Sequence, residues 1–156
     1  MRYLSGIFVF FAGLGLQWLW GMHFTLWGLF PNVLLVLTVA IAARSGPVVG
    51  QCYGFAWGLF LDVASAHVFG ANALAFTIVG YGIGTLRRQM DVESLAPQLL
   101  FVLLLTPGYL LFYGLTGSIF EHTFLWVGWK HFLLEPLFNC VVAPFGFEFV
   151  RKTIDF

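Results

Sequence analysis

Apolar stretches recur along almost the whole chain, separated by short polar breaks. They lie at about 3–20, 24–43, 47–65, 72–86, 96–117 and 131–150, and a helix needs about 20 residues to cross the hydrocarbon core of a bilayer. Only 9% of the 156 residues are charged and the mean hydropathy is +0.92, whereas soluble domains carry about 25% charged residues. The sequence therefore predicts an all-α integral membrane protein, a single transmembrane domain over residues 1–156 with six transmembrane helices.

Two of the six runs need separate consideration. The first resembles a secretory signal, because Arg2 precedes its apolar core, but it lacks a convincing cleavage site. We therefore expect a retained first span. The second run is divided by Pro31, and the part after the proline is short enough for a re-entrant segment.

The basic residues favour six crossings and orient them. Six crossings leave Lys130 alone on one side and put the other basic residues together: Arg2, Arg44, Arg87, Arg88, Arg151 and Lys152. Because lysine and arginine are retained in the cytoplasm, both termini are expected to be cytoplasmic. The tryptophans then fall on the outer side, where they either anchor the protein in lipid or dock a partner: Trp18, Trp20, Trp27, Trp57, Trp126 and Trp129.

Glycine recurs at every fourth position of the third run, and the row ends on a carboxylate: Gly46, Gly50, Gly54, Gly58 and Asp62. In membranes, small residues let two helices approach closely. The next run carries Gly80 and Gly84 at the same spacing. We therefore expect a helix-packing groove between the third and fourth helices, in preference to a docking groove for a partner. Such a groove should absorb the methyl group of alanine at Gly54, but not leucine.

Two acidic residues within or beside the runs are candidate polar contacts. Asp62 lies near the outer end of its run, where His67 and Asn72 follow in the turn and are available to hydrogen-bond the carboxylate. We expect it to lock this turn, and we do not expect ion or proton handling, since no second acid lies at the same depth.

Glu135 precedes Pro136 and has His131 and Asn139 four residues away on the same helix face. Ionisable groups within spans are costly and usually face the interior or a partner. Two interpretations stay open: a satisfied polar group at a proline kink, or a contact with a protein partner or the wall of a substrate pocket.

No catalytic constellation is recognisable in the sequence. We find no Ser-His-Asp set, no metal-spaced His/Cys cluster, no phosphate-binding loop and no carboxylate pair. The formal net charge of zero gives no reason to expect nucleic acid. We therefore expect a protein that is not an enzyme and carries no cofactor or metal.

The stretch from Pro31 to Arg88 resembles MreD, the rod shape-determining membrane protein family of bacteria. The resemblance rests on "PN" before a short apolar run, on Arg44, on "GPVVGQCYGFAWGLFLD", and on "FGANAL" and "VGYGIGTLRR" after the turn. It covers 58 of the 156 residues, and the C-terminal half agrees only in hydropathy.

The resemblance implies a non-enzymatic scaffold in the inner membrane that supports peptidoglycan synthesis and rod shape. Its implied direct partner is MreC, and its functional partners are MreB, RodZ, RodA and a penicillin-binding transpeptidase, in addition to membrane lipid. The implied fold is similar to that of the substrate-binding subunits of energy-coupling-factor transporters. A vitamin or metal transporter subunit is therefore the alternative function. Such subunits dock through an alanine-x-x-x-alanine face in the first helix, which is missing here, because Leu16 follows Ala12 at that spacing.

Overall fold

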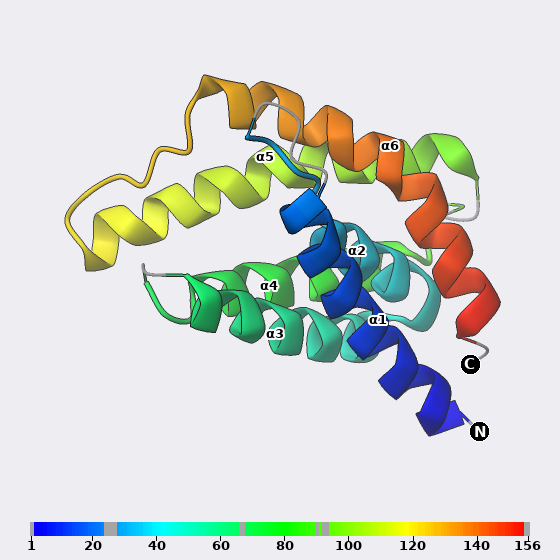
Figure 1. The fold of residues 1–156 in the computed structure, drawn as a ribbon. Coiled ribbons are helices and arrows are strands. Elements are labelled where there is room, and N and C mark those ends of the chain that lie inside the picture. Colours follow the sequence, from blue (N-terminus) through cyan, green and yellow to red (C-terminus); the bar gives the residue numbers. More distant parts are fainter. Residues whose placement is uncertain (1, 24–27, 66–67, 90, 92–93, 155–156) are drawn as a thin grey trace.

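A computed structural model describes residues 2–23, 28–65, 68–89, 91 and 94–154, and within them the chain is helical (Figure 1). The helices are α1 (Arg2–His23), α2 (Val33–Ser45), α3 (Pro47–Ala64), α4 (Ala71–Leu86), α5 (Leu95–Phe120) and α6 (Trp129–Thr153). The all-α class predicted from the sequence is confirmed. By length and composition, α1 from Leu4, α5 and α6 are each long and apolar enough to cross a membrane.

The helix boundaries match five of the six predicted runs to within three residues at each end. The exception is the second run, which was expected at 24–43. Its helix starts at Val33, directly after Pro31 and Asn32. The proline therefore lies ahead of the helix and does not kink it, which agrees with the poor fit of proline to a helix interior.

Helix α2 forms the centre of the molecule. Every residue from Val33 to Ala43 is buried, and α2 contacts each of the other five helices. Its 13 residues extend only about 20 Å at helical rise, well short of the 30 Å hydrocarbon core. A helix that is apolar on all sides must be buried, and here the other five helices bury it.

The other helices enclose α2 as two antiparallel pairs and one single helix (Figure 1). The α3–α4 pair makes the most extensive helix contact in the described chain, and α5 and α6 form the second pair. Helix α1 crosses α2 and α3 on the remaining side. The first turn of α1 and the last turn of α6 lie at the same end of the molecule (Figure 1).

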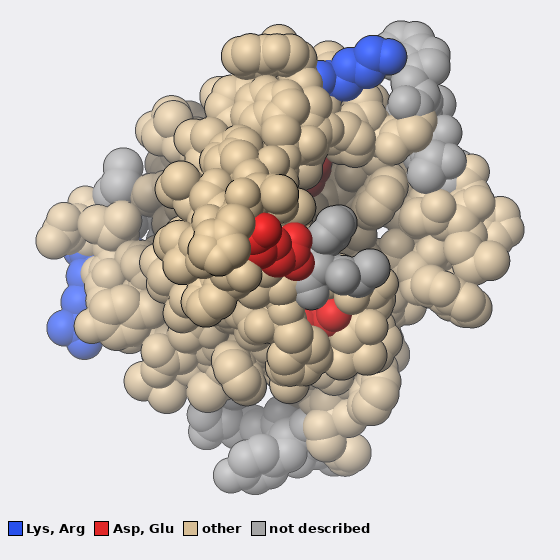
Figure 2. All heavy atoms as spheres, turned by 90° about the vertical axis from the view of Figure 1, so that its left-hand side faces the viewer, with Lys and Arg blue, Asp and Glu red and all other residues tan. Residues whose placement is uncertain are grey.

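The opposite end carries the α3–α4 turn and the α5–α6 connection. Seen from this end, the surface is mostly uncharged, with acidic side chains near the middle of the view and basic side chains at its margins (Figure 2). Exposed aromatic side chains contribute to this end, among them Trp126 and Trp129, whose rings lie 5.1 Å apart.

Candidate functional site

The glycine row of α3 lies against the backbone of α4. A Cβ atom added at Gly58 would lie 2.5 Å from the Cα atom of Ala73, and one added at Gly54 would collide with the carbonyl oxygen of Phe76. A Cβ atom at Gly50 would lie 2.9 Å from the carbonyl oxygen of Gly80. Real Cβ atoms do not come this close to backbone atoms, so these positions have no room for any side chain.

The two glycines of α4 meet the same surface from the other side. A Cβ atom at Gly80 would collide with the carbonyl oxygen of Gly50, and one at Gly84 would collide with the Cα atom of Pro47. Gly46 differs from the rest of the row, because it lies in the turn between α2 and α3 with a φ of 97°. Glycine adopts this left-handed conformation without strain, so Gly46 acts here as a turn residue.

A second face of α3 contacts α1 through two aromatic residues. The Tyr53 hydroxyl donates a hydrogen bond to the carbonyl oxygen of Gly6 at 2.9 Å, and the Trp57 indole donates to that of Phe10 at 3.2 Å. Trp57 is fully buried, so its expected place among the outer tryptophans, as a lipid anchor or a docking residue, is wrong. Trp18 and Trp129 are exposed, and Trp27 lies outside the described residues.

Asp62 caps the N-terminus of α4 from the end of α3. Its side chain is 1% exposed. One carboxylate oxygen accepts hydrogen bonds from the backbone and side-chain nitrogens of Asn72, both at 3.0 Å, and the other accepts from the backbone nitrogen of Ala73 at 2.9 Å. The residue at the N-cap position of α4 is Gly70, which has no side chain to offer. Asp62 therefore satisfies donors that every helix N-terminus leaves open.

The polar contact at Asp62 continues into α5. The Tyr109 hydroxyl donates a hydrogen bond to Oδ1 of Asn72 at 2.6 Å, so Asn72 links the carboxylate of Asp62 to α5. The turn between α3 and α4 is thereby tied to a third helix. His67, the other residue expected beside Asp62, lies outside the described residues.

A second set of polar contacts caps α2, whose N-terminus lies in the interior. The side chain of Asn32 accepts from the backbone nitrogen of Leu35 at 3.1 Å, and Gln17 of α1 accepts from that of Leu34 at 3.3 Å. The backbone nitrogen of Asn32 donates to Oδ1 of Asn139 at 2.7 Å. Backbone amides buried away from water need such partners, which is why a helix can begin here.

Asn139 also joins α6 to α5, because its side-chain nitrogen donates to Oγ1 of Thr106 at 3.0 Å. Glu135 lies one helical turn earlier on α6 and is 8% exposed. Oε2 of Glu135 is 3.6 Å from Nδ1 of His131, which makes this an ion pair when the histidine is protonated. The four polar residues singled out from the sequence, Asp62, Asn72, Glu135 and Asn139, are thus all buried.

Several members of these two sets were not among the residues expected from the sequence: Gln17, Asn32, Thr106 and Tyr109. Each is a polar side chain inside an apolar run. A polar residue within an apolar run is the only sequence signal for such a contact, because polar groups at membrane depth are costly unless they are paired. Both sets complete helix ends and join helices. Among the described residues, no three His, Cys, Asp or Glu side chains gather closely enough to hold a metal ion.

Comparison with known proteins extends the resemblance seen in residues 31–88 to nearly the whole chain. The model of the family described as rod shape-determining protein MreD matches residues 1–153. No curated protein and no solved structure matches the chain. Because the family match includes the C-terminal half, where hydropathy was the only earlier agreement, the chain belongs to the MreD family of rod shape-determining proteins.

Proposed function

We propose that this MreD protein is a non-enzymatic scaffold of the bacterial cell-elongation machinery, acting in the cytoplasmic membrane through direct contact with MreC. One observation carries the proposal: in a chain whose residues 1–153 match the shape-determining family, the buried groups Asp62, Asn72 and Asn139 join helices through hydrogen bonds. Asp62 and Asn139, two of the polar residues singled out from the sequence, both accept hydrogen bonds from backbone amides at helix N-termini.

The proposed topology has six crossings with both termini in the cytoplasm. It is supported by the way in which the basic residues gather at one end. Nη1 of Arg87 donates a hydrogen bond to the carbonyl oxygen of Arg44 at 2.6 Å, and Arg44 and Arg151 line one cavity. Lys130 lies in the first turn of α6, at the opposite end. Retention of positive charge in the cytoplasm then orients the molecule.

In this topology α2 crosses the membrane together with the irregular segment that precedes it. Irregular backbone is tolerated at membrane depth only where protein covers it and its amides are paired. Leu29 and Asn32 are buried, and the first amides of α2 have partners from α1 and α6. The same packing makes α2 a rigid centre around which a partner-binding surface can be held.

The proposed assembly beyond MreC includes RodA, a penicillin-binding transpeptidase, MreB and RodZ. We propose the fold relationship to substrate-binding subunits of energy-coupling-factor transporters as an architectural one, with no transport activity. The observation against transport is that Leu16 follows Ala12 in the first helix, so the docking face of those subunits is missing.

The test is gentle purification of the tagged full-length protein from its native membrane, followed by identification of the proteins that accompany it. We expect a single-pass protein with a periplasmic coiled coil. Recovery of an ATPase subunit in its place would support the transporter alternative and contradict the scaffold.

A functional test uses two identical substitutions in cells depleted of their own MreD. Gly54→Leu collides with the backbone of α4, whereas a Cβ atom at Gly82 of α4 meets nothing within 4 Å. We expect Gly82→Leu to restore rod shape and Gly54→Leu to leave round cells. Rod-shaped cells from both variants, at equal expression, would contradict the proposal that the rigid α3–α4 pair supports the scaffold.

A further inference from the structure

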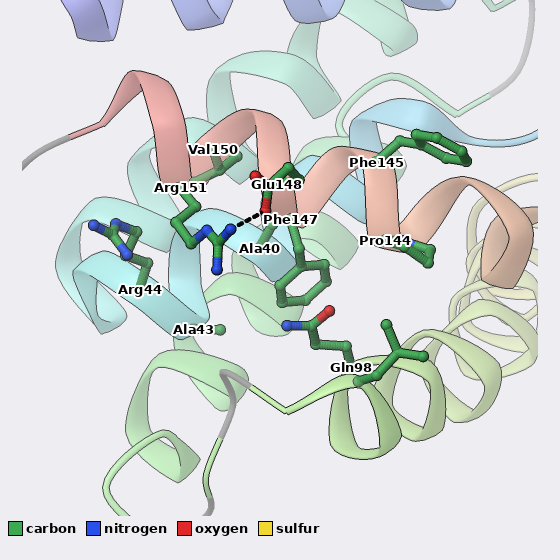
Figure 3. Close-up of a pocket in the computed structure, with 11 residues that line it drawn as sticks. Ala40, Ala43, Arg44, Gln98, Pro144, Phe145, Phe147, Glu148, Val150 and Arg151 are labelled. Carbon is green, nitrogen blue, oxygen red and sulfur yellow. Dashed lines mark ion pairs between the residues drawn. The ribbon is translucent and has the colours of Figure 1, made fainter.

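A cavity of about 670 Å³ opens between the last turns of α2 and α6 and the first turn of α5 (Figure 3). This volume falls within the range of small-molecule sites, about 300–1,000 Å³. The cavity lies at the end of the molecule where the basic residues gather, away from both polar sets described above. Its polar lining consists of Arg44, Gln98, Glu148 and Arg151.

Among the described residues that line this cavity, two arginines stand against one glutamate. Nη2 of Arg151 lies 2.6 Å from one carboxylate oxygen of Glu148, and Nζ of Lys152 lies 3.3 Å from the other. Nε of Arg44 donates to the carbonyl oxygen of Ile154 at 3.0 Å, which holds its guanidinium beside the end of α6. Glu148 therefore pairs with two cationic side chains of its own helix, and Arg44 approaches the same end of α6 from α2.

The two arginines approach the cavity from different helices. In Figure 3, Arg44 and Arg151 lie on the same side of the cavity, and the amide of Gln98 points toward them from α5. Gln98 is 8% exposed. Guanidinium groups bind phosphate oxygens through paired hydrogen bonds, so two of them beside a buried amide form a place suited to a phosphate group.

The opposite wall of the cavity is apolar and faces outward. Phe145 precedes Arg151 by six residues, about 9 Å along α6, and its side chain is 74% exposed. Leu95 on α5 is 58% exposed. Helices α5 and α6 are both long and apolar enough to cross a membrane. Along α6 the lining therefore changes from the charged Arg151 to the apolar Phe145, in the direction from the end of the helix toward its middle, whereas Leu95 lies at the first residue of α5.

We propose that this cavity binds an anionic phospholipid of the surrounding membrane, with its phosphate between Arg44 and Arg151 and its acyl chains along Pro144 and Phe145. The two arginines in the described lining favour an anionic lipid over a zwitterionic one, whose ammonium group would meet the same cations. Basic pockets between transmembrane helices bind anionic headgroups in this way. The inference does not depend on the scaffold function.

The test titrates short-chain phosphatidylglycerol into the full-length protein in detergent and follows the melting temperature, since a ligand of the folded state raises it. Short-chain phosphatidylcholine and inorganic phosphate are titrated in parallel. We expect phosphatidylglycerol alone to stabilise the protein. Equal stabilisation by phosphatidylcholine would overturn the charge selectivity, and equal stabilisation by inorganic phosphate would make this a site for a soluble anion.

Charge variants locate the effect. Arg44→Gln and Arg151→Gln should each weaken phosphatidylglycerol binding by about fivefold, the usual contribution of one basic residue at an anionic surface. Arg88 is exposed at the same end and does not line the cavity, so Arg88→Gln is the matched control and should change the affinity by less than about twofold. An equal loss in all three variants would overturn the site and leave only general attraction to the membrane surface.

A shape variant separates the cavity from its charge. Leu95→Trp fills the cavity from an exposed position and leaves every charge in place, whereas Leu104→Trp adds the same side chain at an exposed position of α5 outside the cavity. We expect only Leu95→Trp to abolish stabilisation by phosphatidylglycerol. Binding of phosphatidylglycerol by Leu95→Trp as strong as by the wild type would contradict the proposal. So would an Arg151→Gln variant that binds the lipid normally but loses a protein that co-purifies with the wild type.

Discussion

The α3–α4 contact and the α2–α6 contact hold the same bundle together by different means. Between α3 and α4 the backbones touch, because glycine stands at Gly50, Gly54, Gly58 and Gly80. Between α2 and α6, Gly146 faces the side chains of Val36 and Leu37, and the side chain of Asn139 reaches across to the amide of Asn32. The first contact depends on the absence of side-chain volume on both helices, whereas the second combines side-chain packing with one polar group.

The two contacts also differ in the charge of the group that caps a helix. The N-terminus of α4 lies beside the turn and is capped by a carboxylate, Asp62. The N-terminus of α2 lies in the interior and is capped by the neutral amides of Asn32, Asn139 and Gln17. Both kinds of cap are buried, and a buried carboxylate is tolerated only when it is paired, a condition that the three donors around Asp62 meet.

The largest expected effect comes from adding volume to the α3–α4 contact. Gly54→Leu should separate the two helices and prevent the detergent-solubilised protein from giving a cooperative melting transition. Even Gly54→Ala should cost about 1–3 kcal/mol, because the new methyl group would collide with the carbonyl oxygen of Phe76. The sequence alone suggested that one methyl group would be absorbed here. A melting temperature for Gly54→Ala equal to wild type would restore that interpretation.

The next effect comes from the charged cap. Asp62→Ala leaves three donors on Asn72 and Ala73 without their acceptor, and we expect a loss of about 2–3 kcal/mol in the free energy of unfolding. Asp62→Asn keeps one acceptor oxygen and should lose about half as much. Thermal melting of both variants in the same detergent gives the comparison. An alanine variant no less stable than the asparagine variant would show that the carboxylate is not acting as a cap.

A smaller effect is expected at the neutral cap. Asn139→Leu removes the acceptor of the Asn32 amide and the donor to Thr106, and hydrogen bonds between membrane helices contribute only about 0.6–2 kcal/mol. We therefore expect a loss of about 1–2 kcal/mol. Hydrogen exchange measured by mass spectrometry should show faster exchange at the start of α2 and no change in α4. Faster exchange in α4 as well would mean that the two caps are coupled.

The smallest effect is expected at a glycine that makes no close contact. A Cβ atom at Gly82 meets nothing within 4 Å. Gly82→Ala should therefore leave the free energy of unfolding unchanged or raise it by at most about 1 kcal/mol, because alanine is the better helix former. The melting temperature measures this change. Gly82 lies two residues from Gly80 on the same helix. Comparing alanine at these two positions therefore separates the effect of the close contact with α3 from the effect of replacing glycine in a helix. Marked destabilisation by Gly82→Ala would weaken the contrast between the two helix contacts.

The parts of the fold that follow from local pattern were predictable from the sequence. Hydropathy located α1, α3, α4, α5 and α6, and the four-residue spacing of glycine indicated which faces of α3 and α4 meet. The break at Pro31 left open where α2 begins, and Asn32 caps the helix locally through Leu35, but the partners on α1 and α6 are far away in sequence and were not predictable. For the same reason Asp62 and Asn72 were recognisable as neighbours across one turn, whereas the link from Asn72 to Tyr109, 37 residues away, was not.

The capping of α2 also has a consequence for the order in which the protein is made. Asn32 and Asn139 are 107 residues apart, and a ribosome that adds about 5–20 residues per second needs roughly 5–20 s to cover that distance. During this interval the second hydrophobic segment is too short to cross the bilayer as a helix alone and has not yet met its last partner. The backbone amide of Asn32 therefore gains its acceptor only after residue 139 has been made, although the contacts of α2 with α1, α3 and α4 can form earlier.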